Sequence, residues 1–114
     1  MLSNTNRLKK EKDFDQVFKK GKGFKEDFLF LKLAKNNLKA TRFGFVVSQK
    51  VSKKAFLRNK IKRRLRELAK KKLAKIKKGF DVILIVNRGL KDKDFNETER
   101  MINKLFKKAK LIND

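Results

Sequence analysis

Apolar residues recur along the chain with two different periods, and each period predicts one type of element. Between residues 57 and 76 they return every three or four positions, which is the period of one helix face. This pattern predicts the longest helix of the protein, within residues 50–78 and entered through a basic loop at 48–54. The positions of its apolar stripe are Leu57, Ile61, Leu65, Leu68, Ala69 and Ile76.

Two shorter helices are predicted near the two ends of the chain, at residues 10–20 and 94–108. Gly21 follows the first one and predicts a left-handed C-cap. Ser52 is the candidate N-cap of the long helix, and Asp94 with a glutamate three residues later has the spacing of a capping box. The predicted apolar stripe of the last helix consists of Phe95, Met101, Ile102, Leu105 and Phe106.

Runs of apolar and β-branched residues predict strands at 28–33, 41–47 and 81–86, with a weaker one at 22–25. The run at 81–86 is apolar on both faces, which predicts a central strand. A turn at Asn36-Asn37 predicts that the strands on either side of it pair as an antiparallel hairpin. In the run at 28–33, one face carries Phe28, Phe30 and Lys32, and the other carries Leu29, Leu31 and Leu33.

The order of elements, α-β-β-β-α-β-α, predicts a single α+β domain over residues 1–114. We expect a two-layer α/β sandwich in which both large helices cover one face of a four-stranded mixed sheet. The strand–helix–strand unit at 42–86 is expected to be right-handed under the general rule for such crossovers.

Charge adds a functional prediction to this fold. The chain has 35 Lys and Arg against 12 Asp and Glu, a net charge of +23. At about 100° per residue, one side of the long helix gathers a basic ridge, which a polyanion would neutralise. A merely solvated face normally mixes signs, but Glu67 is the one acid between residues 50 and 78. The pattern therefore predicts nucleic-acid binding. The residues of the ridge are Asn59, Lys62, Arg63, Arg66 and Lys70, with Arg58 at its edge.

Catalytic chemistry is poorly represented. The chain has no His and no Cys, so the usual general base, thiol nucleophile and transition-metal ligands are missing. The acidic residues are scattered, and neither a P-loop nor a G-x-G-x-x-G motif occurs. We therefore expect no catalytic residue, no metal site and no organic cofactor in the protein itself. No apolar run approaches the ~20 residues that span a bilayer, and the lack of Cys fits a cytoplasmic protein.

The basic helix also carries a family resemblance. Residues 58–67, RNKIKRRLRE, resemble the RNR motif of the bacterial ribonuclease P protein subunit, R-N-x-x-K-R-x-x-R-[EQ]. Arg7-Leu8, Asp13-Phe14, Val17-Phe18 and Gly21 are similar to the family's amino-terminal motif. Residues 43–48 and 79–83 are similar to two of its strands, so the resemblance covers nearly the whole chain in the family's order.

The resemblance implies a fold like domain 2 of ribosomal protein S5, with a left-handed crossover, against the general rule. It also implies the function of a ribonuclease P protein subunit. In that endoribonuclease, the RNA subunit with Mg²⁺ removes the 5′ leader of precursor tRNA, and the protein binds both RNAs. We therefore expect Mg²⁺ to be bound mainly by the RNA subunit, and the protein to be a monomer in a one-to-one ribonucleoprotein.

The resemblance assigns residues to two binding surfaces. The residues expected to bind the RNA subunit are Lys53, Lys54, Arg58, Asn59, Lys62, Arg63, Arg66 and Lys70. Those expected to bind the leader are Phe14, Phe18, Lys50 and Arg88, together with an open face of the sheet. For Asn59, capping of the local backbone remains an alternative, and Phe14 and Phe18 could equally be core anchors.

Two other functions fit part of the pattern. A basic ribosomal or nucleoid-associated protein would explain the charge but not the ordered motifs. A membrane-surface protein could use the basic amphipathic helix, although that helix lacks Trp.

Overall fold

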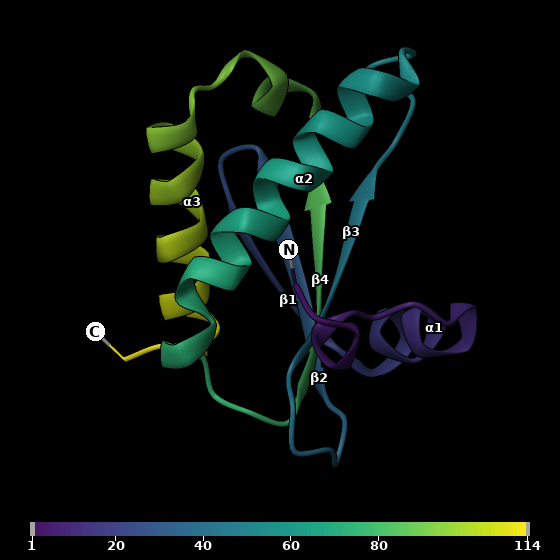
Figure 1. The fold of residues 1–114 in the computed structure, drawn as a ribbon, viewed down its shortest axis with the longest axis vertical. Coiled ribbons are helices and arrows are strands. Elements are labelled where there is room, and N and C mark those ends of the chain that lie inside the picture. Colours follow the sequence, from purple (N-terminus) through teal and green to yellow (C-terminus); the bar gives the residue numbers. More distant parts are fainter. Residues whose placement is uncertain (1, 114) are drawn as a thin grey trace.

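The computed structural model describes residues 2–113 and has the predicted order of helices and strands (Figure 1). The helices are α1 (Glu11–Lys20), α2 (Ala55–Lys72) and α3 (Phe95–Lys108), and the strands are β1 (Lys22–Glu26), β2 (Leu29–Lys35), β3 (Arg42–Val47) and β4 (Phe80–Val86). Short 3₁₀ turns lie at Asn4–Asn6, Leu73–Lys75 and Arg88–Asp92. Among these residues, no helix is long and apolar enough to cross a membrane.

The four strands form one mixed sheet in the order β1-β2-β4-β3. β4 lies in the interior, antiparallel to β2 and parallel to β3, which confirms its predicted central position. The expected hairpin between the strands at 28–33 and 41–47 is wrong, because β4 is inserted between them. The connection after β2 passes the start of β4 instead, where the Asn36 N–H donates to the carbonyl oxygen of Gly79 at 2.9 Å.

The β3–α2–β4 unit has the left-handed crossover that the resemblance implied. In Figure 1, β3 and β4 point in the same direction, α2 passes in front of the sheet, and β4 lies to the left of β3. A right-handed crossover seen from this side would place β4 on the right. The general rule therefore gives the wrong hand for this unit.

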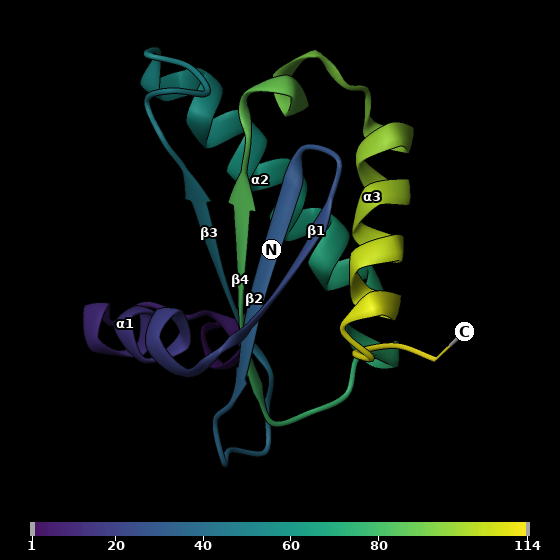
Figure 2. The same cartoon turned by 180° about the vertical axis from the view of Figure 1, so that it is seen from behind.

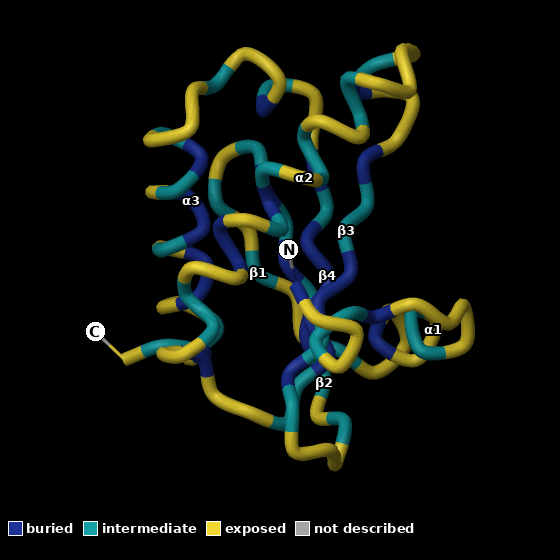
Figure 3. Tube along the Cα trace, viewed as in Figure 1, coloured by how far each residue is buried: buried dark blue, intermediate teal, exposed yellow. Residues whose placement is uncertain are grey.

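The two faces of the sheet are covered unequally. α2 and α3 lie on one face, where Leu31, Leu84 and Phe43 pack with Leu65 and Phe106 in the main core. α1 lies on the opposite face and crosses only one end of it (Figure 2). The buried residues in Figure 3 accordingly follow the strands and the inward sides of α2 and α3. The second face therefore keeps an area that no helix covers.

Several local predictions fail for identifiable reasons. Gly21 is extended (φ −77°), not left-handed, and glycine is needed because a Cβ there would lie 2.4 Å from the Val17 carbonyl oxygen. Ser52 is not the N-cap of α2; Lys54 is, and the Ser52 hydroxyl accepts from its N–H at 3.2 Å. The Asp94 carboxylate does accept the N–H of the glutamate three residues later, at 2.8 Å, as predicted for an N-cap.

Three further predictions need correction. α2 ends at Lys72 rather than continuing to residue 78. Phe95 is exposed at the start of α3 and is not part of its buried stripe. Phe28 lies in the turn before β2 and packs against the main core, so it does not share the face of Phe30 and Lys32.

Candidate nucleic-acid interface

The outward side of α2 presents a continuous basic ridge. Leu65, Leu68 and Ala69 are fully buried against the sheet, which turns the opposite side of the helix toward solvent. The predicted ridge residues lie on this side and are exposed or half-buried: Asn59, Lys62, Arg63, Arg66 and Lys70. None of the four cations among them forms an ion pair with a carboxylate of residues 2–113. Their charge is therefore available to a polyanion.

The end of α2 that faces α3 differs from the ridge. Lys71 and Lys72 both bind the Glu99 carboxylate, at 3.1 and 3.2 Å. The hydrogen bonds and charges of these two lysines hold the pKa of Glu99 below its ordinary value. These two cations are paired within the protein, so their charge is less available to a polyanion than that of the ridge.

Arg58 holds the basic loop in place. Its Nη1 donates to the carbonyl oxygens of Ser52 and Lys53 at 2.9 and 3.0 Å. Lys53 and Lys54 are exposed beside it, at the start of α2. Arg58 therefore orders the loop that carries the predicted lysines, and the backbone contact predicted as an alternative for Asn59 is made by Arg58.

Arg66 is fixed against the sheet. Its guanidinium lies 5.8 Å from the centroid of the Phe45 ring on β3, within the range of a cation–π contact. The neighbouring Arg64 turns the other way and donates to the Lys93 carbonyl oxygen at 3.4 Å. The two nearby arginines thus differ in role, with Arg66 on the ridge and Arg64 linking α2 to the segment before α3.

The second predicted surface is the partly open face of the sheet beside α1. Phe14 is half-buried, and its ring lies so close to β3 that a Cβ at Gly44 would be 2.5 Å from it. Phe18 is 40% exposed. Lys32 lies beside Phe18, with its Nζ 5.9 Å from the ring centroid and 2.9 Å from the Phe18 carbonyl oxygen, to which it donates. Phe14 thus has a packing role, whereas Phe18 presents its ring to solvent.

This arrangement identifies the accessible sheet face, which the sequence left undecided. Phe30 and Lys32 on β2 are half-buried on the α1 side, and Ile85 on the adjoining β4 and Val46 on β3 pack there too. The residues that alternate with them on β2 point to the other face and are buried beneath α2 and α3: Leu29, Leu31 and Leu33. A single-stranded ligand can therefore reach only the face of Phe30 and Lys32.

The remaining predicted leader residues lie at the far edge of this face. β3 and β4 are parallel, so their carboxyl ends meet at one edge, away from α1. Lys50 follows β3 and Arg88 follows β4, and both are exposed. Val17 of α1 packs against Ile83, so only the last residues of β4 separate α1 from this edge. Aromatic and cationic groups thus bound the two ends of one strip.

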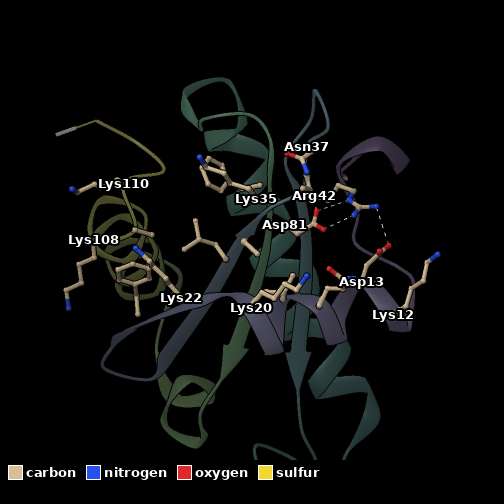
Figure 4. Close-up of a pocket in the computed structure, with 18 residues that line it drawn as sticks. Lys12, Asp13, Lys20, Lys22, Lys35, Asn37, Arg42, Asp81, Lys108 and Lys110 are labelled. Carbon is tan, nitrogen blue, oxygen red and sulfur yellow. Dashed lines mark hydrogen bonds and ion pairs between the residues drawn. The ribbon is translucent and has the colours of Figure 1, made fainter.

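One charged cluster was missed at the sequence level. Arg42 binds Asp81 through two hydrogen bonds of 2.8 and 2.7 Å and contacts Asp13 at 3.4 Å, while the Asn36 amide donates to Asp81 at 2.9 Å. The hydrogen bond to Asp81 is the main cause of a raised pKa for Arg42. The cluster lies in a pocket between α1, the sheet and the end of α3, where Lys20 and other lysines surround it (Figure 4). Its charged residues, Asp13, Arg42 and Asp81, are far apart in sequence, so no local sequence pattern predicts the cluster.

Comparisons with family models, curated proteins and solved structures all find the same family. A family model described as Ribonuclease P matches residues 2–110. A Clostridium botulinum ribonuclease P protein component is 36% identical over 109 residues, covering 95% of this chain and 97% of that protein. The solved structure of a Staphylococcus aureus RNase P protein has a TM-score of 0.87 at 32% identity and covers 95% of this chain and 98% of its own. The solved structure of the Thermotoga maritima RNase P protein has a TM-score of 0.82 at 33% identity, and the match covers 90% of this chain and 96% of that one.

These matches extend over the ridge, the sheet face and almost all of the chain between them. They support the ribonuclease P interpretation and not the ribosomal or nucleoid alternative. The chain therefore belongs to the ribonuclease P family, as an RNA-binding protein component of this tRNA-processing enzyme.

Proposed function

We propose that the chain uses its two surfaces for two different RNAs. The ridge of α2, with the loop that Arg58 orders, binds the ribonuclease P RNA subunit. The strip from Phe18 to Lys50 and Arg88 binds the 5′ leader of precursor tRNA. The observation that carries this division is the unequal covering of the sheet: the ridge lies on the helix-covered side, and the accessible strip lies on the other.

The chemistry of the strip suits an unpaired strand. Phe18 and the half-buried Phe30 present aromatic surface on which bases can stack, and Lys32 and Lys50 supply positive charge for the backbone. A duplex offers no free base faces to such a surface. This favours the leader, which is single-stranded, over the folded body of the tRNA.

We assign hydrolysis to the RNA subunit. The protein has neither His nor Cys. Residues 2–113 also contain no group of three or more acidic side chains placed to hold a metal ion, which supports a Mg²⁺ site outside the protein. Mg²⁺ would then be bound mainly by the RNA subunit. The protein's part is to reduce the repulsion between two polyanions and to fix the leader in position.

The same charge bears on stoichiometry and location. A net charge of +23 opposes self-association of the free protein, which supports one protein per RNA subunit. The absence of Cys matches a reducing compartment, and we place the complex in the cytoplasm.

The test is reconstitution of precursor tRNA cleavage at low Mg²⁺, using a bacterial ribonuclease P RNA with and without this chain. We expect cleavage to require the chain under these conditions. A parallel titration with leaderless tRNA should show weaker binding than precursor tRNA. If the chain does not stimulate cleavage, the proposal is rejected and the ribosomal or nucleoid-associated alternative must be reconsidered.

A further inference from the structure

Phe56, in the first turn of α2, is 66% exposed, more than any other large apolar side chain among residues 2–113. Single exposed apolar residues are common on proteins and carry no argument alone. The position of Phe56 is what makes it informative, because the next residue, Leu57, turns inward and is half-buried. Phe56 is therefore not a core residue displaced by an irregular helix end.

Phe56 belongs to the outward ridge of α2. It lies three, four and seven residues before Asn59, Lys60 and Arg63, the spacing of one helix face, and all four side chains are exposed. At about 100° per residue, Phe56 falls between Asn59 and Lys60 around the helix axis. A ligand that covers the ridge would therefore also cover the Phe56 ring.

The surroundings of Phe56 are cationic and ordered. The Nζ of Lys54 lies 6.0 Å from the ring centroid. The backbone just before the ring is held by Arg58, whose guanidinium binds the Ser52 and Lys53 carbonyl oxygens. An exposed aromatic ring beside cations, on an ordered backbone, matches the way proteins bind unpaired nucleotides, with the base stacked on the ring and the phosphate beside the cations.

We propose that Phe56 is a stacking platform for one unpaired base of the RNA that covers the α2 ridge. The inference rests on the proposed function and adds a base contact to a surface otherwise assigned to phosphates. The base must be unpaired, because a base within a duplex is already stacked on both faces. A second copy of this chain is a poor occupant, since the ring lies in the positive field of its own ridge.

The sequence offers a clean probe, because the chain contains no Trp and no Tyr. A Phe56→Trp variant carries a single indole at the proposed platform. Titration with the ribonuclease P RNA subunit alone should quench its fluorescence and protect it from acrylamide. A Phe95→Trp variant is the matched control, since Phe95 is also exposed but begins α3, away from the ridge. Its fluorescence should change little.

Affinity provides the second readout. Phe56→Leu keeps an apolar side chain but removes the aromatic face, and it should weaken RNA-subunit binding about five- to a hundredfold, whereas Phe56→Trp should retain it. Circular dichroism of each variant checks that the fold is intact, which the exposure of Phe56 leads us to expect.

Three outcomes would overturn the inference while leaving the proposed function standing. The first is tight RNA binding of the Phe56→Trp variant in a gel shift with unchanged indole fluorescence and acrylamide access. The second is equal affinity of the Phe56→Leu and parent proteins. The third is an indole response of the Phe56→Trp variant to a leader oligonucleotide but not to the RNA subunit. Failure of the parent protein to bind the RNA subunit at all would instead reject the proposed function, and the inference with it.

Discussion

Replacement of Arg63 by Ala should make RNA-subunit binding less dependent on salt by the amount of one phosphate contact. Arg63 is exposed on the α2 ridge and forms no ion pair among residues 2–113, so its charge is not used within the protein. Each phosphate contact contributes about 0.7–0.9 to the slope of log K against log salt concentration. The slope of the Arg63→Ala variant should therefore be shallower by that amount or less.

This slope translates into a measurable ratio of affinities. Between about 50 and 200 mM salt, a difference of about 0.7–0.9 in slope changes the parent-to-variant affinity ratio by about threefold. The loss should be larger at low salt. Filter binding or gel shifts across that range, with the same RNA preparation, would measure it. Folding stability in urea should be nearly unchanged, because surface substitutions away from special contacts cost within about 0.5 kcal/mol.

Lys39→Ala is the matched control, since Lys39 is an exposed cation in the turn between β2 and β3. It removes the same charge without touching the ridge. Parallel salt dependence of the parent and Arg63→Ala proteins would remove Arg63 from the phosphate contacts. An equal effect of Lys39→Ala would show that total charge, rather than the ridge, governs binding.

The other predictions concern the sheet face and the charged clusters. Phe18→Ala should weaken binding of precursor tRNA more than of leaderless tRNA and barely alter stability, because the ring is 40% exposed; equal losses for both RNAs would contradict a leader contact. Asp81→Asn should lower the unfolding free energy by about 2–3 kcal/mol in urea, since Arg42 loses the nearer of its two carboxylate partners in a largely buried site and keeps only the longer contact to Asp13; an unchanged midpoint would show that the pair is dispensable. The hydrogen bond from Lys108 holds the pKa of Glu26 below its ordinary 4.5, so the stability from this pair is present above that pH and is lost as the pH falls below it. Acid titration of unfolding should show a smaller loss in Glu26→Gln, and identical curves would contradict the pairing.

Hydrophobic periodicity was sufficient to predict the order of the elements and the inward side of α2. Leu65 and Leu68 repeat at helix spacing and are buried, and the apolar run of β4 is indeed the interior strand. Periodicity could not predict strand pairing. The turn after β2 favours a local hairpin, whereas the actual neighbour of β2 is β4, more than forty residues later. The pairing of β2 with β4 places a strand on each edge of the apolar β4, and this arrangement is a property of the whole sheet.

The candidate site divides in the same way. The ridge was predictable because its residues are close in sequence and share one helix face. The different environments of Phe14, which packs on the sheet, and Phe18, which faces solvent, were not predictable. They depend on Gly44, a residue distant in sequence whose lack of a side chain leaves room for the Phe14 ring. The resemblance, not the spacing, supplied the left-handed crossover, since the general rule predicts the other hand.

The insertion of β4 between β2 and β3 has a consequence for assembly on the ribosome. β3 leaves the exit tunnel before the strand that is to lie beside it, and all of α2 is synthesised before β4 can fill the gap between β2 and β3. The sheet closes only when β4 enters that gap. Until then, the edges of β2 and β3 that will face β4 carry unpaired N–H and C=O groups.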